Sequence, residues 1–78
     1  MSDASGQTDL VEREHAELSS LAAALTEALE RVAASAERLG VGGREGDAAD
    51  LYEVERALSQ ASRRLDAVVR SLANKGQS

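Results

Sequence analysis

The chain has 78 residues, contains no Pro, Cys, Trp or Phe, and carries a formal net charge of −5 at pH 7. Its length limits it to one small domain, and the missing cysteines exclude disulfides and thiolate metal sites. The negative charge argues against general nucleic-acid binding, which requires an excess of positive charge. Abundant Ala, Leu, Glu and Arg, together with the absence of Pro, predict an all-α protein.

The first seven residues are rich in Ser, Gly and Asp and predict a disordered N-terminal lead-in. This stretch has neither the basic residues nor the apolar run of a signal peptide. No later segment approaches the ~20 apolar residues of a membrane span. We therefore expect a cytoplasmic protein that does not bind membranes, with secretion by a route that needs no cleaved signal as the alternative.

A first helix is predicted over residues 9–39, with Thr8 or Asp9 as its N-cap. Asp9 and Glu12 have the spacing of a capping box. Apolar residues then recur at alternating steps of three and four, which is typical of a helix that packs along a narrow seam. The two heptad positions of this predicted seam are occupied by Val11, Leu18, Leu25, Val32 and Leu39, and by Glu14, Leu21, Ala28 and Ser35.

The first helix is predicted to end at Gly40, because Gly followed by the apolar Val41 matches a Schellman motif. In that motif Gly40 adopts the left-handed conformation and Val41 packs back on the last turn. Residues 40–47 then form a loop, and Asp47 caps a second helix over residues 48–73. The two heptad positions of its predicted seam are occupied by Leu51, Leu58, Leu65 and Leu72, and by Val54, Ala61 and Val68.

The short connection makes the two helices antiparallel neighbours. Charge supports this arrangement, because residues 1–30 have a net charge of −6 and residues 56–78 have a net charge of +4. Antiparallel packing brings these opposite charges together, whereas parallel packing sets acidic residues against acidic residues. The predicted fold is therefore an antiparallel, coiled-coil-like two-helix hairpin over residues 8–75, followed by a tail over residues 76–78.

Additional apolar residues lie beside the seam of the first helix and widen its apolar stripe towards that of a bundle helix. A lone hairpin would leave this stripe in water. We therefore expect a four-helix bundle, completed by dimerisation or by another helical protein, with no cofactor and no small-molecule substrate. The residues predicted for this second interface are Leu10, Ala22, Leu29, Ala36, Tyr52 and Val69.

Glu12 and His15 are the candidate metal ligands, because the Glu-x-x-His spacing places both on one helix face, as in di-iron carboxylate bundles. A solvated acidic helix start, which the helix dipole favours, is the other interpretation. A di-iron site also needs carboxylates from the facing helix, and the facing stretch, residues 72–75, contains no acidic residue. The solvated interpretation is favoured, with a metal-binding bundle as an alternative function.

Arg56, Arg63 and Arg70 are spaced by seven residues and, with Arg64, form a candidate surface for a partner. Such a line more often forms interhelical ion pairs along the edge of a seam. His15 is the only imidazole, so no triad is present, and the Gly-rich loop lacks the Gly-Lys-Ser/Thr ending of a phosphate-binding loop. The expected function is a non-enzymatic protein–protein interaction module, acting as a homodimer or as a small subunit or adaptor.

Two helices joined by a Gly-containing turn also resemble, in architecture, the small substrates of actinobacterial type VII secretion. A Trp-x-Gly turn marks that family, and the corresponding Leu39-Gly40-Val41-Gly42 contains no Trp. The resemblance implies a small secreted helical hairpin, which is a second alternative.

Overall fold

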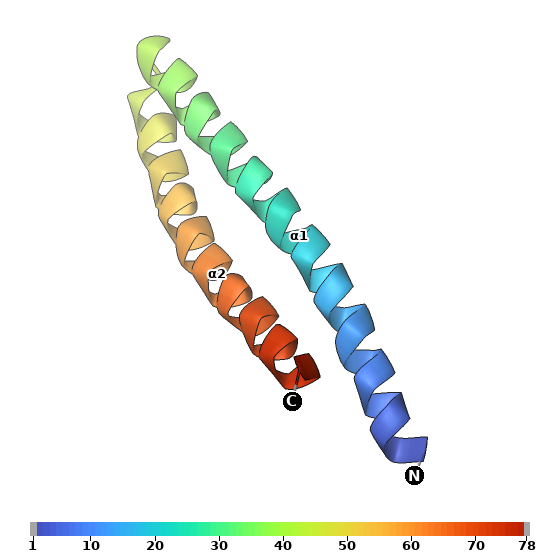
Figure 1. The fold of residues 1–78 in the computed structure, drawn as a ribbon. Coiled ribbons are helices and arrows are strands. Elements are labelled where there is room, and N and C mark those ends of the chain that lie inside the picture. Colours follow the sequence, from blue (N-terminus) through green and yellow to red (C-terminus); the bar gives the residue numbers. More distant parts are fainter. Residues whose placement is uncertain (1, 78) are drawn as a thin grey trace.

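The computed structural model describes residues 2–77, which form two α-helices joined by a three-residue turn. Helix α1 spans Ser2–Val41 and helix α2 spans Glu45–Gln77. The helices run antiparallel and side by side, with the turn at one end of the molecule, and α1 extends beyond α2 at the other end (Figure 1). The result is a rod with extents of 63 × 15 × 14 Å. The predicted antiparallel hairpin is confirmed.

Both helices are longer than the sequence pattern predicts. Helix α1 begins at Ser2, so most of the lead-in predicted over residues 1–7 is helical, and Met1 lies outside the described residues. Helix α2 continues to Gln77 and includes most of the predicted tail, while Ser78 lies outside the described residues. No Pro interrupts these stretches, and placing Ser, Asp, Asn or Gln in a helix costs less than about 1 kcal/mol per residue.

Helix α1 ends in a Schellman motif, but the motif lies at Gly43 rather than at Gly40. Gly43 has a φ of +87°, and its N–H donates to the Gly40 carbonyl oxygen at 3.2 Å. The N–H of Arg44 donates to the Leu39 carbonyl oxygen at 2.8 Å, which completes the motif. Val41, which was predicted to pack back on the helix, is instead 88% exposed.

Gly40 lies inside helix α1, at the point where α2 approaches it. A Cβ atom added to Gly40 would lie 3.7 Å from the Cβ atom of Ala48. The N–H of Ala48 donates to the Arg44 carbonyl oxygen at 2.9 Å, and the Arg44 side chain pairs with Asp47 at 2.5 Å. Asp47 was predicted as the N-cap, but it lies in the first turn of α2, where its charge complements the helix dipole.

Gly43→Ala is expected to lower the free energy of unfolding by about 1 kcal/mol, because a Cβ atom is strained at a φ of +87°. Gly46→Ala is the matched control, since Gly46 lies within α2 and a Cβ atom there meets nothing within 4 Å. This control is expected to raise the free energy of unfolding by roughly 0.5–1 kcal/mol, because Ala favours a helix. Urea unfolding followed by circular dichroism measures both. Equal losses at the two positions would contradict the assigned motif.

The register of the hairpin follows from contacts at its two ends. Near the turn, Gly40 faces Ala48. At the other end, a shallow depression brings His15 together with Leu72 and Ala73. The other facing positions are found by counting residues along both helices between these two points. The pairs are Ala36 with Leu51, Val32 with Glu55, Leu29 with Leu58, Leu25 with Ser62, Ala22 with Leu65, and Leu18 with Val69.

The seam keeps one predicted heptad column of each helix and replaces the other. The column of large aliphatic side chains, which includes Leu18 and Leu58, is half-buried. The second predicted column lies outside the seam, where Leu21, Val54 and Val68 are 48%, 43% and 46% exposed. Its place in the seam is taken by His15, Ala22, Leu29, Ala36, Ala48, Glu55, Ser62 and Val69.

The physical reason for this correction lies near the turn. Each helix has one column of large aliphatic side chains flanked on both sides by mostly apolar or small residues, with Glu14, His15 and Glu55 as the exceptions, so the periodicity permits closure on either side. The three-residue turn brings the start of α2 against the end of α1. On that side Ala36, Gly40 and Ala48 are small enough for the backbones to approach closely. These small residues therefore select the seam.

The interior of the hairpin is thin. Within the part of the chain that the structure describes, the buried apolar residues are Ala36 and Ala48, at 0% and 5% exposure. The Leu and Val side chains of the seam are half-buried, and no large side chain among the described residues is fully buried. A two-helix seam thus leaves the flank of each large side chain in contact with water.

Candidate interaction surface

One side of the hairpin carries an apolar stripe to which both helices contribute. Its residues immediately precede seam positions such as Ala22 and Val69. The burial pattern of residues 11–30 repeats position for position over residues 51–70, so an approximate two-fold axis perpendicular to their plane relates the antiparallel helices. Such an axis keeps equivalent positions on the same side. We call this stripe the apolar face: Leu21, Ala28 and Ser35 of α1, and Val54, Ala61 and Val68 of α2.

The apolar face is continuous from one helix to the other. In the register given above, Leu21 lies level with Val68, and Ala28 lies level with Ala61. At 1.5 Å per residue the face extends over about 20 Å of the rod. The large seam side chains beside it are half-buried and add to the apolar area that solvent can reach. Exposed apolar residues gathered on one side make this face a candidate interaction site.

The opposite side of the hairpin is more polar. The equivalent positions there hold Ser19, Thr26 and Ala33 in α1, and Tyr52, Ser59 and Asp66 in α2. Tyr52, predicted as an interface residue, therefore lies on this polar side and is 46% exposed. The hairpin is therefore amphipathic across its width, with one side suited to water and the other to a second apolar surface.

Charged residues line both outer edges of the apolar face. Along α1, Glu17 lies towards the start of the chain, whereas Arg31 and Arg38 lie near the turn. Along α2, Asp50 lies near the turn and Arg64 lies farther from it. All five side chains are exposed, and none forms an ion pair with the side chains that the structure describes. Each edge of the face thus carries one sign of charge near the turn and the other sign away from it.

Four of the six residues predicted for the second interface lie between the two helices instead. Ala22, Leu29 and Val69 are half-buried in the seam, and Ala36 is fully buried. This correction follows from the position of the seam, which lies one residue farther along each helix than predicted. The column that contains Ala22 and Leu29 therefore lies between the helices, and the column that contains Leu21 lies outside. Leu10 is 52% exposed and lies at the edge of the apolar face, towards the start of α1.

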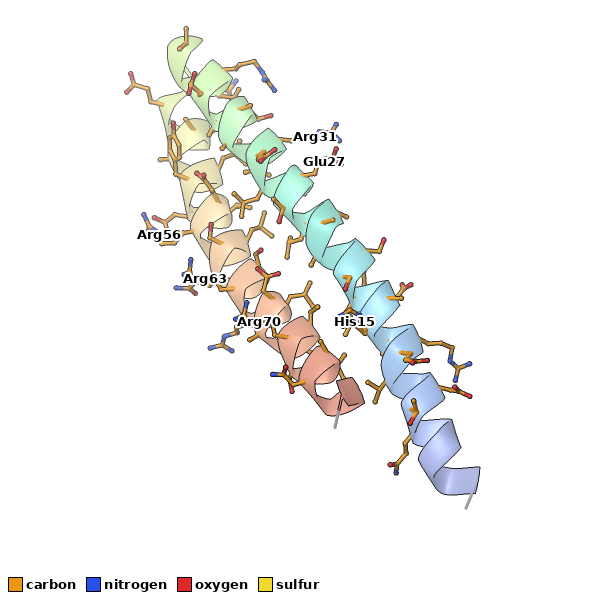
Figure 2. The ribbon with its side chains drawn as sticks, viewed as in Figure 1. His15, Glu27, Arg31, Arg56, Arg63 and Arg70 are labelled. Atoms are coloured by element: carbon orange, nitrogen blue, oxygen red, sulfur yellow. The ribbon has the colours of Figure 1, made fainter. Side chains whose placement is uncertain are left out.

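The predicted arginine surface is divided between two sides of α2. Arg56, Arg63 and Arg70 point away from α1 along the outer edge of α2 (Figure 2). Instead of an interhelical pair, Arg56 binds Glu53 within its own helix, with Nη1 2.9 Å from Oε2 and 3.1 Å from Oε1. Arg64 lies about 100° farther round the helix and borders the apolar face. The four arginines do not form one surface.

His15 projects from α1 towards α2 and is half-buried beside Leu72 and Ala73 (Figure 2). Glu12 lines the same shallow depression. Among the described residues there is no group of three or more His, Cys, Asp or Glu side chains placed to hold a metal ion. Glu12 and His15 supply two ligands, whereas zinc sites in proteins ordinarily use three or four. The position of His15 is accounted for by packing in the seam.

His15→Leu is expected to raise the free energy of unfolding by roughly 0.5–1 kcal/mol, because an apolar side chain replaces an imidazole beside Leu72. Zn²⁺ and Fe²⁺ are expected to leave the melting temperature of the unmodified chain unchanged. Thermal unfolding with and without metal measures both effects. A metal-dependent rise in melting temperature that His15→Leu abolishes would favour the metal-binding alternative.

Neither helix, over its described residues, contains an apolar stretch long enough to cross a membrane. Comparisons of the chain with models of protein families, with curated proteins and with solved structures found no match. The candidate interaction surface therefore rests on the residues of this chain alone.

Proposed function

We propose that this protein is a non-enzymatic helical interaction module whose apolar face completes a four-helix bundle with two helices of a partner. The partner is a second copy of the chain or another helical protein, for which this chain serves as a small subunit or adaptor. One observation carries the proposal. Leu21, Val54 and Val68 stay about half exposed on a hairpin whose buried apolar residues, in its described part, are two alanines.

The accessible area of the hairpin supports the proposal. The chain exposes 5839 Å², whereas a folded monomer of 8.2 kDa typically exposes about 4,500 Å². Removing the difference from both chains of a dimer would bury about 2,600 Å², which falls within the range of obligate homodimer interfaces. The excess area is therefore of the size that a stable helical interface covers.

Bundle geometry also accounts for the distribution of apolar residues around each helix. A helix in a four-helix bundle contacts two neighbours, so it needs apolar residues on both sides of its central column. The central columns here, which contain Leu25 and Leu58, are flanked on one side by the other seam column, which contains Ala22 and Val69, and on the other side by the apolar face. The seam accommodates one neighbour, and the apolar face accommodates the second.

Thermal unfolding at a series of chain concentrations tests the proposal. If a second copy covers the apolar face, the melting temperature rises with concentration, because binding to the folded state stabilises it by mass action. If another helical protein covers it, the isolated chain is only partly helical in dilute solution and gains helicity in the complex. A fully helical chain with a cooperative melting temperature that is independent of concentration would overturn the proposal.

A further inference from the structure

We propose that the partner on the apolar face is a second copy of this chain, packed with its turn at the opposite end of the rod. The inference rests on the proposed function, because it names the occupant of the apolar face and its orientation. A two-fold dimer uses the same patch on both chains, so the patch must be complementary to itself. The apolar face meets this requirement in shape and in charge.

The shape of the face suits a second copy. Ala28 and Ala61 lie level in its middle, with Val54 and Val68 on either side in α2, and with Leu21 and the smaller Ser35 on either side in α1. A copy turned end for end sets alanines against alanines, or sets Leu21 against the Ala28 of the other chain. Either fit lets the backbones approach closely. Ser35 is the one polar residue of the face, and its Oγ already accepts a hydrogen bond from Arg38 at 3.0 Å.

The charged edges are also complementary to themselves. When the second copy is turned end for end, α1 runs antiparallel to the α1 helix of the other chain. Glu17 then lies along the stretch that contains Arg31 and Arg38 of the second copy. The match is looser along α2: with alanines against alanines, Asp50 lies opposite position 72 of the second copy, about 12 Å along the rod from Arg64 of that copy. Two-fold symmetry repeats each attraction, and a partner of uniform charge would lack this match.

The balance of charge along the rod favours opposite ends for the two turns. The half next to the turn, residues 27–61, contains eight acidic and four basic residues, a net charge of −4. The remaining half contains six acidic and five basic residues, a net charge of −1. Turns at the same end would set the two −4 halves against each other across helices whose axes lie about 8–10 Å apart. Turns at opposite ends set each −4 half against a −1 half, which lowers the repulsion.

Distance measurement between spin labels tests the orientation in the intact chain. The sequence contains no Cys, so Val41→Cys introduces a single thiol, at a position that is 88% exposed and next to the turn. With the turns at opposite ends, the two labels of a dimer lie roughly 40–50 Å apart, because the separation follows the 1.5 Å rise per residue along both helices. With the turns at the same end, the labels lie within roughly 20 Å, a distance set by helix packing.

A matched pair of labels tests which side of the hairpin the second copy covers. Ala23 and Ala24 are adjacent and exposed, but Ala24 lies at the edge of the apolar face and Ala23 lies on the polar side. A nitroxide on Ala24→Cys is expected to lose mobility as the chain concentration rises, while one on Ala23→Cys stays mobile. The opposite result would place the second copy on the polar side and overturn the inference.

The outcomes separate this inference from the function on which it rests. A mass of two chains with the long label distance supports both. A mass of two chains with the short distance overturns the orientation and leaves the interaction module intact. A chain that stays monomeric and becomes fully helical only with another helical protein overturns self-association alone. A monomer that is fully helical at every concentration overturns both.

Discussion

Replacing Leu21 and Val68 by Asp is expected to convert the proposed dimer into a monomer at micromolar concentration. The two residues lie level on the apolar face and are 48% and 46% exposed in the hairpin. The double variant therefore leaves the seam between α1 and α2 intact but places four carboxylates in the dimer interface. Burying unpaired charges costs several kcal/mol, so a loss of at least ~3 kcal/mol, about 100-fold in Kd, is expected.

The matched control carries the same number of new carboxylates elsewhere on both helices. Ala23→Asp with Ala67→Asp adds one Asp to α1 and one to α2 at exposed positions that point away from the apolar face. It carries the same change in charge and a larger cost in helix propensity, because Ala is the strongest helix former. Sedimentation equilibrium measures the Kd of self-association for both variants. Retention of the dimer by the Leu21/Val68 variant, or equal weakening of both variants, would remove the apolar face as the interface.

The second large effect is expected at Glu55, a half-buried carboxylate in the seam that faces Val32. It forms no hydrogen bond or ion pair with the side chains that the structure describes. Glu55→Leu replaces a half-buried carboxylate by an apolar side chain in the seam, so a gain of about 1 kcal/mol in the free energy of unfolding is expected. Urea unfolding at pH 7 measures this gain.

Glu30→Leu is the control for this experiment, because this substitution removes the same charge from an exposed position of α1. Exposed substitutions of this kind usually alter stability by less than about 0.5 kcal/mol. The comparison also tests the register. Had the hairpin closed along Val54, Ala61 and Val68, Glu55 would lie outside the seam, and the two substitutions would have similar small effects.

The sequence was sufficient to predict the helices and their antiparallel arrangement. The signals for them are local: the absence of Pro, the heptad spacing of Leu and Val, and the Gly-rich connection. Such signals can be recognised in the sequence without knowledge of the tertiary packing. The ends of the helices were less predictable. Gly40, Gly42 and Gly43 all follow the last heptad residue of α1, and the Schellman motif at Gly43 depends on how closely α2 packs against Gly40.

The choice of seam could not be predicted, because the neighbouring columns are nearly equivalent. In α1, the column with Leu21 and the column with Leu29 flank the same line of large aliphatic residues. Periodicity alone favours the column of α2 that contains Val54 over the one that contains Glu55. Tertiary packing at the turn decides otherwise, since Ala36 and Ala48 allow close approach there. The small residues next to the turn were the sequence signal for this choice.

The same near-equivalence explains why this hairpin suits assembly. A helix with apolar residues on only one side of its central column would be satisfied by a single neighbour. Both helices here carry them on two sides, and the approximate two-fold axis brings the unused columns together on one face. The feature that made the seam ambiguous in the sequence is therefore also the feature that leaves apolar residues exposed on the proposed interaction surface.

The most direct test of this account is the solution mass of the unmodified chain, measured by light scattering across a dilution series with circular dichroism on the same samples. For the proposed dimer we expect a mass of two chains, twice 8.2 kDa, together with high helicity at micromolar concentration. We also expect mass and helicity to fall together on dilution. A mass of 8.2 kDa with full helicity at every concentration would contradict the proposal, because the apolar face would then be stable in water without a partner.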